Sequence, residues 1–222
     1  MIAALQGLVA LLGLLSGGAS PTPQAKPEPP RADRPAIVQR PIRFGAERKR
    51  EMKAYAKRHY GISTYRLKSP KVIVEHYTVT TTLSSAYNTF AADRPDPELN
   101  ELPGVCAHFI VDRDGTIVQL VPLSLMCRHT IGLNHRSIGI EMVGMNAKEI
   151  LGRKRQRRSV VRLTAWLKCR EGISQANVIG HAMSLTSPFH EERVVKLRKR
   201  THGDWTADEL APIRRDLKRY SC

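Results

Sequence analysis

The stretch "KVIVEHYTVT", residues 71–80, has the composition of a buried β-strand that ends on a histidine. Its first positions are β-branched, and such side chains favour a pleated, half-buried backbone. Glu75 and His76 then stand where a core strand would continue with aliphatic side chains. The pattern predicts a strand at 71–78 with an imidazole near its carboxyl end.

The other segments predict helices and further strands in mixed order. The clearest is "CAHFIVDRDGTIVQLVP", residues 106–122, where two alternating apolar runs flank an Asp-Gly turn typical of a β-hairpin. Strands are also expected at 137–144 and 177–180, and helices at 47–59, after a cap at Thr82 or Ser84, at 147–170, and at 207–220 after Thr206. This mixture predicts an α/β fold, a single domain with a central mixed β-sheet flanked by helices.

The chain of 222 residues suits one domain with a leader. Residues 1–20 hold a short apolar run followed by small residues, which predicts a signal peptide, with a membrane anchor or a misassigned start as alternatives. Residues 21–45 are Pro-rich and are expected to form a linker, which leaves 46–222 as the folded domain. Export would place the protein in the periplasm or outside the cell, with no stable membrane insertion after processing.

Four cysteines accompany this expected export to an oxidising compartment. Cys106 and Cys127 flank the predicted hairpin and could bridge its base, and a bridge between Cys169 and Cys222 is the other pairing considered. The chain contains no C-x-x-C pair, so a structural zinc knuckle is not expected.

The formal net charge of +16 predicts attraction to an anionic partner. Nucleic acid is the alternative that the charge raises, but no helix-turn-helix, zinc-finger or RNP-like pattern is present, and aromatic residues make up 5% of the chain. The run "RKRQRR", residues 153–158, indicates either a solvated helix face or a contact with anionic cell-wall polymers.

Two of the eight histidines, His76 and His181, follow apolar strand-like runs. In open α/β sheets, sites collect at the carboxyl ends of strands. Glu141 lies inside the predicted strand at 137–144, where a buried carboxylate is costly unless a cation stands beside it. That position suits a general base with a raised pKa, and an exposed glutamate on an edge strand is the alternative.

Four motifs in order, "EHYT", "AHFIVDRDGTIVQLVP", "RHTIGLNHRSIGIEMVG" and "VIGH", make residues 70–210 resemble the zinc-dependent N-acetylmuramoyl-L-alanine amidases of the amidase-2 type. Their fold is shared with peptidoglycan recognition proteins. The resemblance implies a Zn²⁺ hydrolase that cuts peptidoglycan or muropeptides between the lactyl group of N-acetylmuramic acid and L-alanine of the stem peptide. A zinc-free peptidoglycan receptor of the same fold is the alternative.

The resemblance also implies which residues hold the metal. His76 and His181 match the first two zinc ligands, and His202 is expected as the third. The interval of 21 residues between His181 and His202 looks longer than in compact bacterial members, so His190 and Asp204 stay open as rival donors.

Roles beyond the metal follow from the same resemblance. Glu141 matches the catalytic glutamate, and Ala107 stands where some relatives carry a tyrosine, which leaves Glu141 as the proton shuttle. Arg200 is expected to stabilise the oxyanion, because it matches a loop position where some relatives carry a lysine. His129 and Asn134 resemble groove residues that contact the substrate.

Overall fold

The structure is a computed structural model that describes residues 30–222, so the predicted signal peptide lies outside the described residues. Six strands form one sheet in the order β1-β4-β3-β5-β2-β6. Their bounds are Val38–Gln39 (β1), Val72–Tyr77 (β2), Phe109–Val111 (β3), Ile117–Gln119 (β4), Ser137–Met142 (β5) and Val178–Gly180 (β6). Only the β3–β4 pair is antiparallel, which confirms the predicted mixed sheet and the hairpin.

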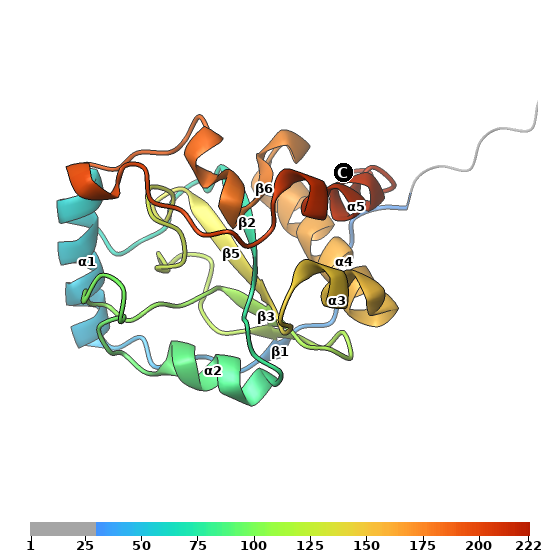
Figure 1. Ribbon diagram of the computed structural model, residues 1–222, viewed down its shortest axis with the longest axis horizontal. Coiled ribbons are helices and arrows are strands. Elements are labelled where there is room, and N and C mark those ends of the chain that lie inside the picture. The colour runs from blue at the N-terminus through green and yellow to red at the C-terminus, as the bar shows by residue number, and fades with distance from the viewer. Residues whose placement is uncertain (1–29) are drawn as a thin grey trace, which may run out of the picture.

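Helices cover both sides of this sheet, with α1 and α2 on one side and α3, α4 and α5 on the other (Figure 1). Their bounds are Ala46–Tyr60 (α1), Leu83–Ala91 (α2), Ala147–Gly152 (α3), Lys154–Glu171 (α4) and Ala207–Leu217 (α5), with short 3-10 turns at Gln175–Asn177 (η1), His181–Thr186 (η2) and Val195–Leu197 (η3). The side chains of Thr82 and Thr206 cap α2 and α5, as predicted.

The prediction of one continuous helix over 147–170 is wrong. Arg153 has an extended backbone (φ −88°, ψ 92°) and separates α3 from α4. Its guanidinium donates to the Val143 carbonyl at 3.0 Å and pairs with Glu149. These contacts stabilise the break, because they bind the breaking residue to the end of β5 and to α3.

Parallel pairing of β2 with β5 places His76 directly opposite Glu141. Residues opposite one another in a sheet share a face, so both side chains lie on the side of α1. Glu75 faces α4 instead, where the Thr164 hydroxyl donates to its Oε1 at 2.6 Å. Burial raises the pKa of Glu75 to about 7, so the unusual carboxyl in this strand is accommodated in the core beneath the site.

Residues 30–45, the described part of the predicted linker, are extended but lie against the domain. Val38 pairs with Val118 in the sheet, and Ile42 is buried in the core. The disulfides Cys106–Cys127 and Cys169–Cys222 both form, which confirms the two pairings considered from the sequence. Within residues 30–222, no helix combines the length and apolarity needed to cross a bilayer.

The buried Arg48 joins α1 to the loop after α2. Its guanidinium donates to the carbonyls of Phe90 (3.1 Å) and Gly104 (3.0 Å) and lies 3.4 Å from the Asp93 carboxylate. Arg48→Ala would remove the guanidinium donor from the carbonyls of Phe90 and Gly104 and leave a cavity in the core, so we expect the free energy of unfolding to fall by about 3 kcal/mol. Urea denaturation measures this, and Arg50→Ala on the exposed face of α1 should cost less than about 0.5 kcal/mol. Equal losses for the two variants would contradict this role.

His108, directly before β3, joins the loop at Leu125 to β5 at Gly139 and gives stability a pH dependence. Its Nε2–H donates to the Leu125 carbonyl, its Nδ1 accepts from the Gly139 N–H, both at 3.0 Å, and burial lowers its pKa to about 4. This contribution is complete above the unfolded-state pKa of about 6.5 and is lost as pH falls toward 4, about 3 kcal/mol in all. Unfolding free energies measured across this range should therefore fall more steeply for the wild type than for His108→Gln, and parallel curves would contradict it.

Candidate active site

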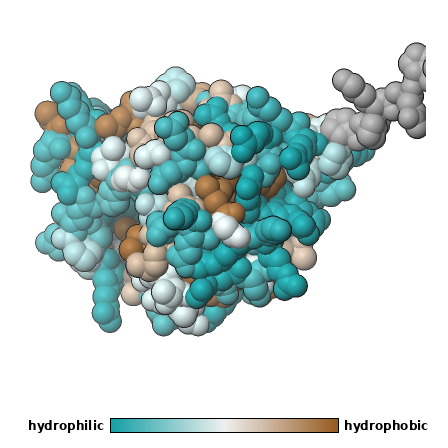
Figure 2. Space-filling view, turned by 45° about the vertical axis from the view of Figure 1, so that its right-hand side comes forward, coloured by the Kyte–Doolittle hydropathy of each residue, from teal (hydrophilic) through white to brown (hydrophobic). Residues whose placement is uncertain are grey.

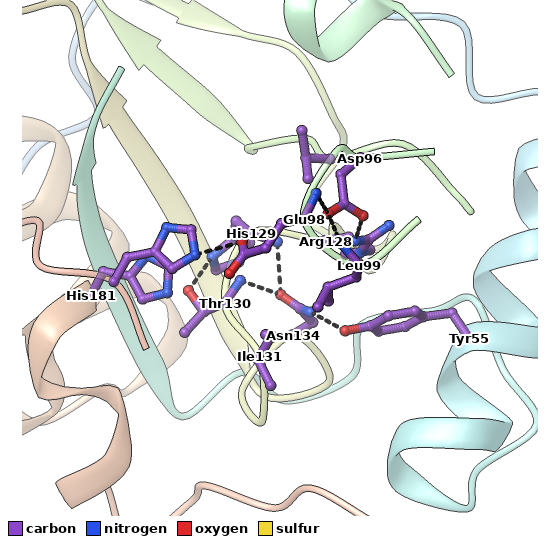
Figure 3. Close-up of a pocket in the computed structure, with 12 residues that line it drawn as sticks. Tyr55, Asp96, Glu98, Leu99, Arg128, His129, Thr130, Ile131, Asn134 and His181 are labelled. Atoms are coloured by element: carbon purple, nitrogen blue, oxygen red, sulfur yellow. Dashed lines mark hydrogen bonds and ion pairs between the residues drawn. The ribbon is translucent and has the colours of Figure 1, made fainter. Parts of the chain in front are cut away.

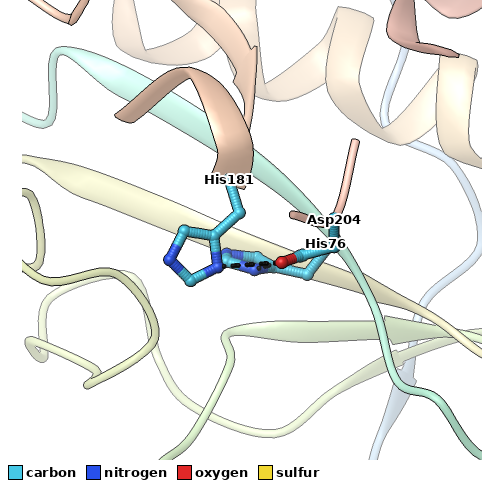
Figure 4. Close-up of side chains that lie close together, drawn as sticks. All are labelled: His76, His181 and Asp204. Atoms are coloured by element: carbon cyan, nitrogen blue, oxygen red, sulfur yellow. Dashed lines mark hydrogen bonds and ion pairs between the residues drawn. The ribbon is translucent and has the colours of Figure 1, made fainter. Parts of the chain in front are cut away.

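Three side chains from distant parts of the chain meet at one edge of the sheet (Figure 4). His76 lies near the end of β2, His181 directly follows β6, and Asp204 lies in the loop before α5. Nδ1 of His76 is 3.1 Å from Asp204 Oδ2, and Nδ1 of His181 is 3.2 Å from Asp204 Oδ1. The donor atoms of the three all lie within 4.8 Å of one another.

Backbone packing places Asp204 in this cluster. A Cβ atom at position 180 would lie only 1.7 Å from the main-chain oxygen of Trp205. Only glycine therefore allows the loop to approach β6 this closely. The Ala182 N–H donates to the Asp204 carbonyl at 3.0 Å. Trp205 itself is fully buried and adopts a left-handed backbone (φ 53°), which turns the chain from Asp204 into the cap of α5.

Burial and mutual hydrogen bonds shift the pKa values of all three side chains in the cluster. Burial alone would raise the pKa of Asp204, but hydrogen bonds from His181 and His76 hold it well below its usual range. Burial lowers the pKa of His181 to about 4, although Asp204 opposes the shift. For His76, burial is outweighed by the hydrogen bond to Asp204 and the charge of Glu141, so its pKa is raised.

Glu141 lies beside this cluster on β5, between β3 and β2, and 8% of it is exposed. The expected buried position is confirmed, and an exposed glutamate on an edge strand is excluded. Its Oε2 has no hydrogen-bond partner among residues 30–222. Burial raises the pKa of Glu141 to about 7, against the opposing charge of His76.

The four side chains line a cleft of about 270 Å³, together with Tyr77, Val79 and Phe90. A smaller pocket of about 60 Å³ adjoins it and shares Arg128 and His129 with the cleft (Figure 3). The combined hollow therefore extends from the three-residue cluster toward α1.

The two residues expected to contact substrate differ in their placement. His129 lines both hollows, with its Nδ1 3.1 Å from Nε2 of His76. Asn134 is fully buried, where its Oδ1 accepts from the N–H groups of His129 (2.8 Å) and Thr130 (2.7 Å) and its amide donates to the Tyr55 hydroxyl at 3.2 Å (Figure 3). Asn134 thus shapes the loop that forms the pocket wall.

His202, expected as a metal ligand, lies at the rim. Its ring stacks on His181 with centroids 4.8 Å apart, while its Nε2 is 2.9 Å from Oε2 of Glu98. Arg200 forms an ion pair with Glu98 and does not line the cleft. His190, one of the rival donors, packs against Gly132 instead.

The clustered donors fit a catalytic zinc ion. Two imidazole nitrogens and one carboxylate oxygen form a donor set that Zn²⁺ uses in enzymes that keep a fourth position for water or substrate. His76 and His181 were found from strand-end patterns, whereas Asp204 was only a rival to His202. The sequence signal for Asp204 was its place two residues after His202 and two residues before the predicted cap at Thr206.

Comparison with known proteins agrees with this geometry. Residues 66–201 match the family model described as N-acetylmuramoyl-L-alanine amidase. A search of curated proteins finds no match.

Solved structures with a similar fold include a mutant endolysin from Bacillus subtilis, 22% identical with a TM-score of 0.51, over 82% of this chain and 98% of that chain. The endolysin amidase LysCS from Clostridium intestinale is 21% identical with a TM-score of 0.54, over 84% and 98% of the two chains. Likeness at these identities concerns the fold alone. Because the family model covers more than half of the sequence, the chain belongs to the N-acetylmuramoyl-L-alanine amidase family.

Proposed function

We propose that the chain is a peptidoglycan hydrolase that cuts the amide bond between the lactyl group of N-acetylmuramic acid and L-alanine of the stem peptide. The observation that carries this proposal is the meeting of three metal donors with a buried, unpartnered carboxylate, Glu141, in one cleft. Family membership supports the same reaction. A peptidoglycan receptor without zinc would have no use for this combination.

His76, His181 and Asp204 would hold the zinc ion, with Asp204 in place of the expected His202. When bound, Zn²⁺ supplies a Lewis acid that polarises the scissile carbonyl and lowers the pKa of water. Glu141 accepts the proton of the attacking water and returns it to the amine of L-alanine as that amine leaves. Its free Oε2 and its position opposite His76 support this role.

The rim residues would act around this centre. His129 lines both the cleft and the smaller pocket and would contact substrate. Asn134 would hold the backbone of His129 in place, since its Oδ1 accepts from the His129 N–H. Arg200 would act indirectly, since it binds Glu98, which in turn holds His202 beside His181. Substrate of this class and the predicted leader favour action in the periplasm or outside the cell.

Glu141→Gln tests the proton shuttle. Loss of a general acid–base group should lower the rate of stem-peptide release from soluble muropeptides by about 10²–10⁴-fold, measured by mass spectrometry. Zinc content should stay at the wild-type level, and the free energy of unfolding should not fall, because a buried unpartnered carboxylate is removed. Glu47→Gln, at an exposed position, serves as the control. An active Glu141→Gln enzyme would exclude Glu141 as the shuttle.

The third ligand is tested by metal analysis of purified variants. We expect Asp204→Ala and His76→Ala to lose most of their zinc and all detectable release of stem peptide, because each removes one of three donors. His202→Ala should retain zinc. Zinc loss in His202→Ala together with zinc retention in Asp204→Ala would restore His202 as the ligand.

Chelation of the metal distinguishes the zinc hydrolase from a zinc-free peptidoglycan receptor. Removal of metal from the wild type should abolish release, and added Zn²⁺ should restore it. A protein that binds muropeptides but contains no zinc and releases no peptide would instead be the receptor.

A further inference from the structure

The outer face of α4 carries a row of cations, which we call the α4 ridge: Lys154, Arg158, Arg162 and Arg170. Lys154, Arg158 and Arg162 recur every four residues, so they share one side of the helix. Arg170 lies eight residues further on, about 80° further around the helix and about 24 Å from Lys154 along its axis. All four side chains are exposed. The opposite face of α4 is buried in the core through Val160, Leu163 and Leu167, among others, so the ridge is not needed for packing.

Most of the ridge has no counter-charge within the protein. Among residues 30–222, Lys154, Arg158 and Arg162 form no ion pair, whereas Arg170 pairs with its neighbour Glu171. Like charges four residues apart destabilise a helix by a few tenths of a kcal/mol per pair. A bound polyanion would relieve this repulsion.

The ridge continues around one aromatic side chain. The guanidinium carbon of Arg170 lies 5.3 Å from the Trp166 ring centroid, and that of Arg34, from the extended segment before β1, lies 5.7 Å from it. The half-buried indole thus brings a fifth cation into the row.

A groove of about 380 Å³ runs beside the ridge. Its walls include Pro35 and Val38 from the N-terminal segment, Ile117 from β4, and Ser159 and Arg162 from α4. Asp114 is the one acidic residue in its lining. The groove therefore offers apolar contacts with a cation at its edge, which suits a polymer whose CH groups alternate with anions.

The chemistry of the ridge favours phosphate. Four of the five cations are arginines, whose planar guanidinium groups match phosphate oxygens in pairs. The cations span about 24 Å along the helix axis, so a polymer that follows them around the helix would engage several of them with its phosphates. The view turned toward the α3–α5 side is mostly hydrophilic (Figure 2), and the ridge has no apolar row that could insert into a bilayer. Trp166 is the ridge's only aromatic ring, which disfavours stacking of successive nucleic-acid bases.

We propose that the α4 ridge and its groove bind a cell-wall polymer with repeating phosphate groups. The choice of a wall polymer rests on the proposed function. α4 covers the face of the sheet opposite to the side on which His76 and Glu141 lie, so the polymer and the substrate can be bound at the same time (Figure 1). The ridge would hold the enzyme on the wall while the cleft acts on a nearby stem peptide.

The test titrates the full chain with a glycerol-phosphate oligomer of about ten units, at several salt concentrations. The variant K154Q/R158Q/R162Q should bind at least 10-fold more weakly than the wild type. The slope of log K against log salt should fall by about 2, since each neutralised phosphate of a single strand contributes about 0.7. The control R50Q/K53Q/K57Q removes the same charge from exposed positions on α1 and should change binding less than 3-fold.

Two results of these titrations, besides a failure of the wild type to bind the polymer, would overturn the proposal. Equal weakening in the two triple variants would mean that net charge alone attracts the polymer. Tighter binding, by 10-fold or more, to single-stranded or duplex DNA with the same number of phosphates would make the ridge a nucleic-acid surface.

Release of stem peptide from soluble muropeptides, measured in parallel, separates this proposal from the proposed function. Release should be unchanged in K154Q/R158Q/R162Q. If the wild type releases stem peptide but does not bind the polymer, only the proposed polymer-binding site is excluded. If the ridge binds the polymer but no stem peptide is released, only the proposed hydrolase function is excluded.

Discussion

The site depends on the parallel register of β2 against β5. This pairing puts His76 opposite Glu141 and turns both toward the same hollow. Because side chains alternate along a strand, a slip of one residue would exchange His76 for Glu75 on that face. The aliphatic side chains on the opposite face of both strands pack against α4 and α5, and this packing fixes the register.

The second constraint is the approach of the last loop to β6. Gly180 admits the backbone of Trp205, and the buried indole fixes the chain between the site and α5. Asp204 is thereby held between two imidazoles, where its charge is stabilised by hydrogen bonds on both sides. Two imidazoles and one carboxylate from distant parts of the chain are thereby brought together at the end of the sheet.

The two faces of the sheet divide the work of the protein. The α1 side contains the hollow, where burial shifts the pKa values of His181 and Glu141 in opposite directions. The α4 side buries Glu75 in the core, and the outer surface of α4 exposes unpaired cations to solvent. Part of the positive charge therefore lies on the outer surface of α4, away from the hollow. The chemistry of the hollow depends on a few buried groups.

Much of the architecture was predictable from local patterns. The alternation around His76, the Asp-Gly turn of the hairpin and the Thr206 cap each report a short-range preference, and β2, β3–β4 and α5 formed where these patterns predicted them. Gly152 weakens the helix just before the break, but the break at Arg153 also depends on contacts with Val143 and Glu149, which the local sequence does not reveal.

The sequence by itself determined that two histidines follow strands and that a carboxylate lies inside a third strand. It did not determine which side chain completes the cluster, since His190, His202 and Asp204 all lie in a long connection whose path is set by distant contacts. Only the tertiary structure chose Asp204. The physical reason is the tight packing of Trp205 on Gly180, which turns Asp204 inward and leaves His202 stacked at the rim.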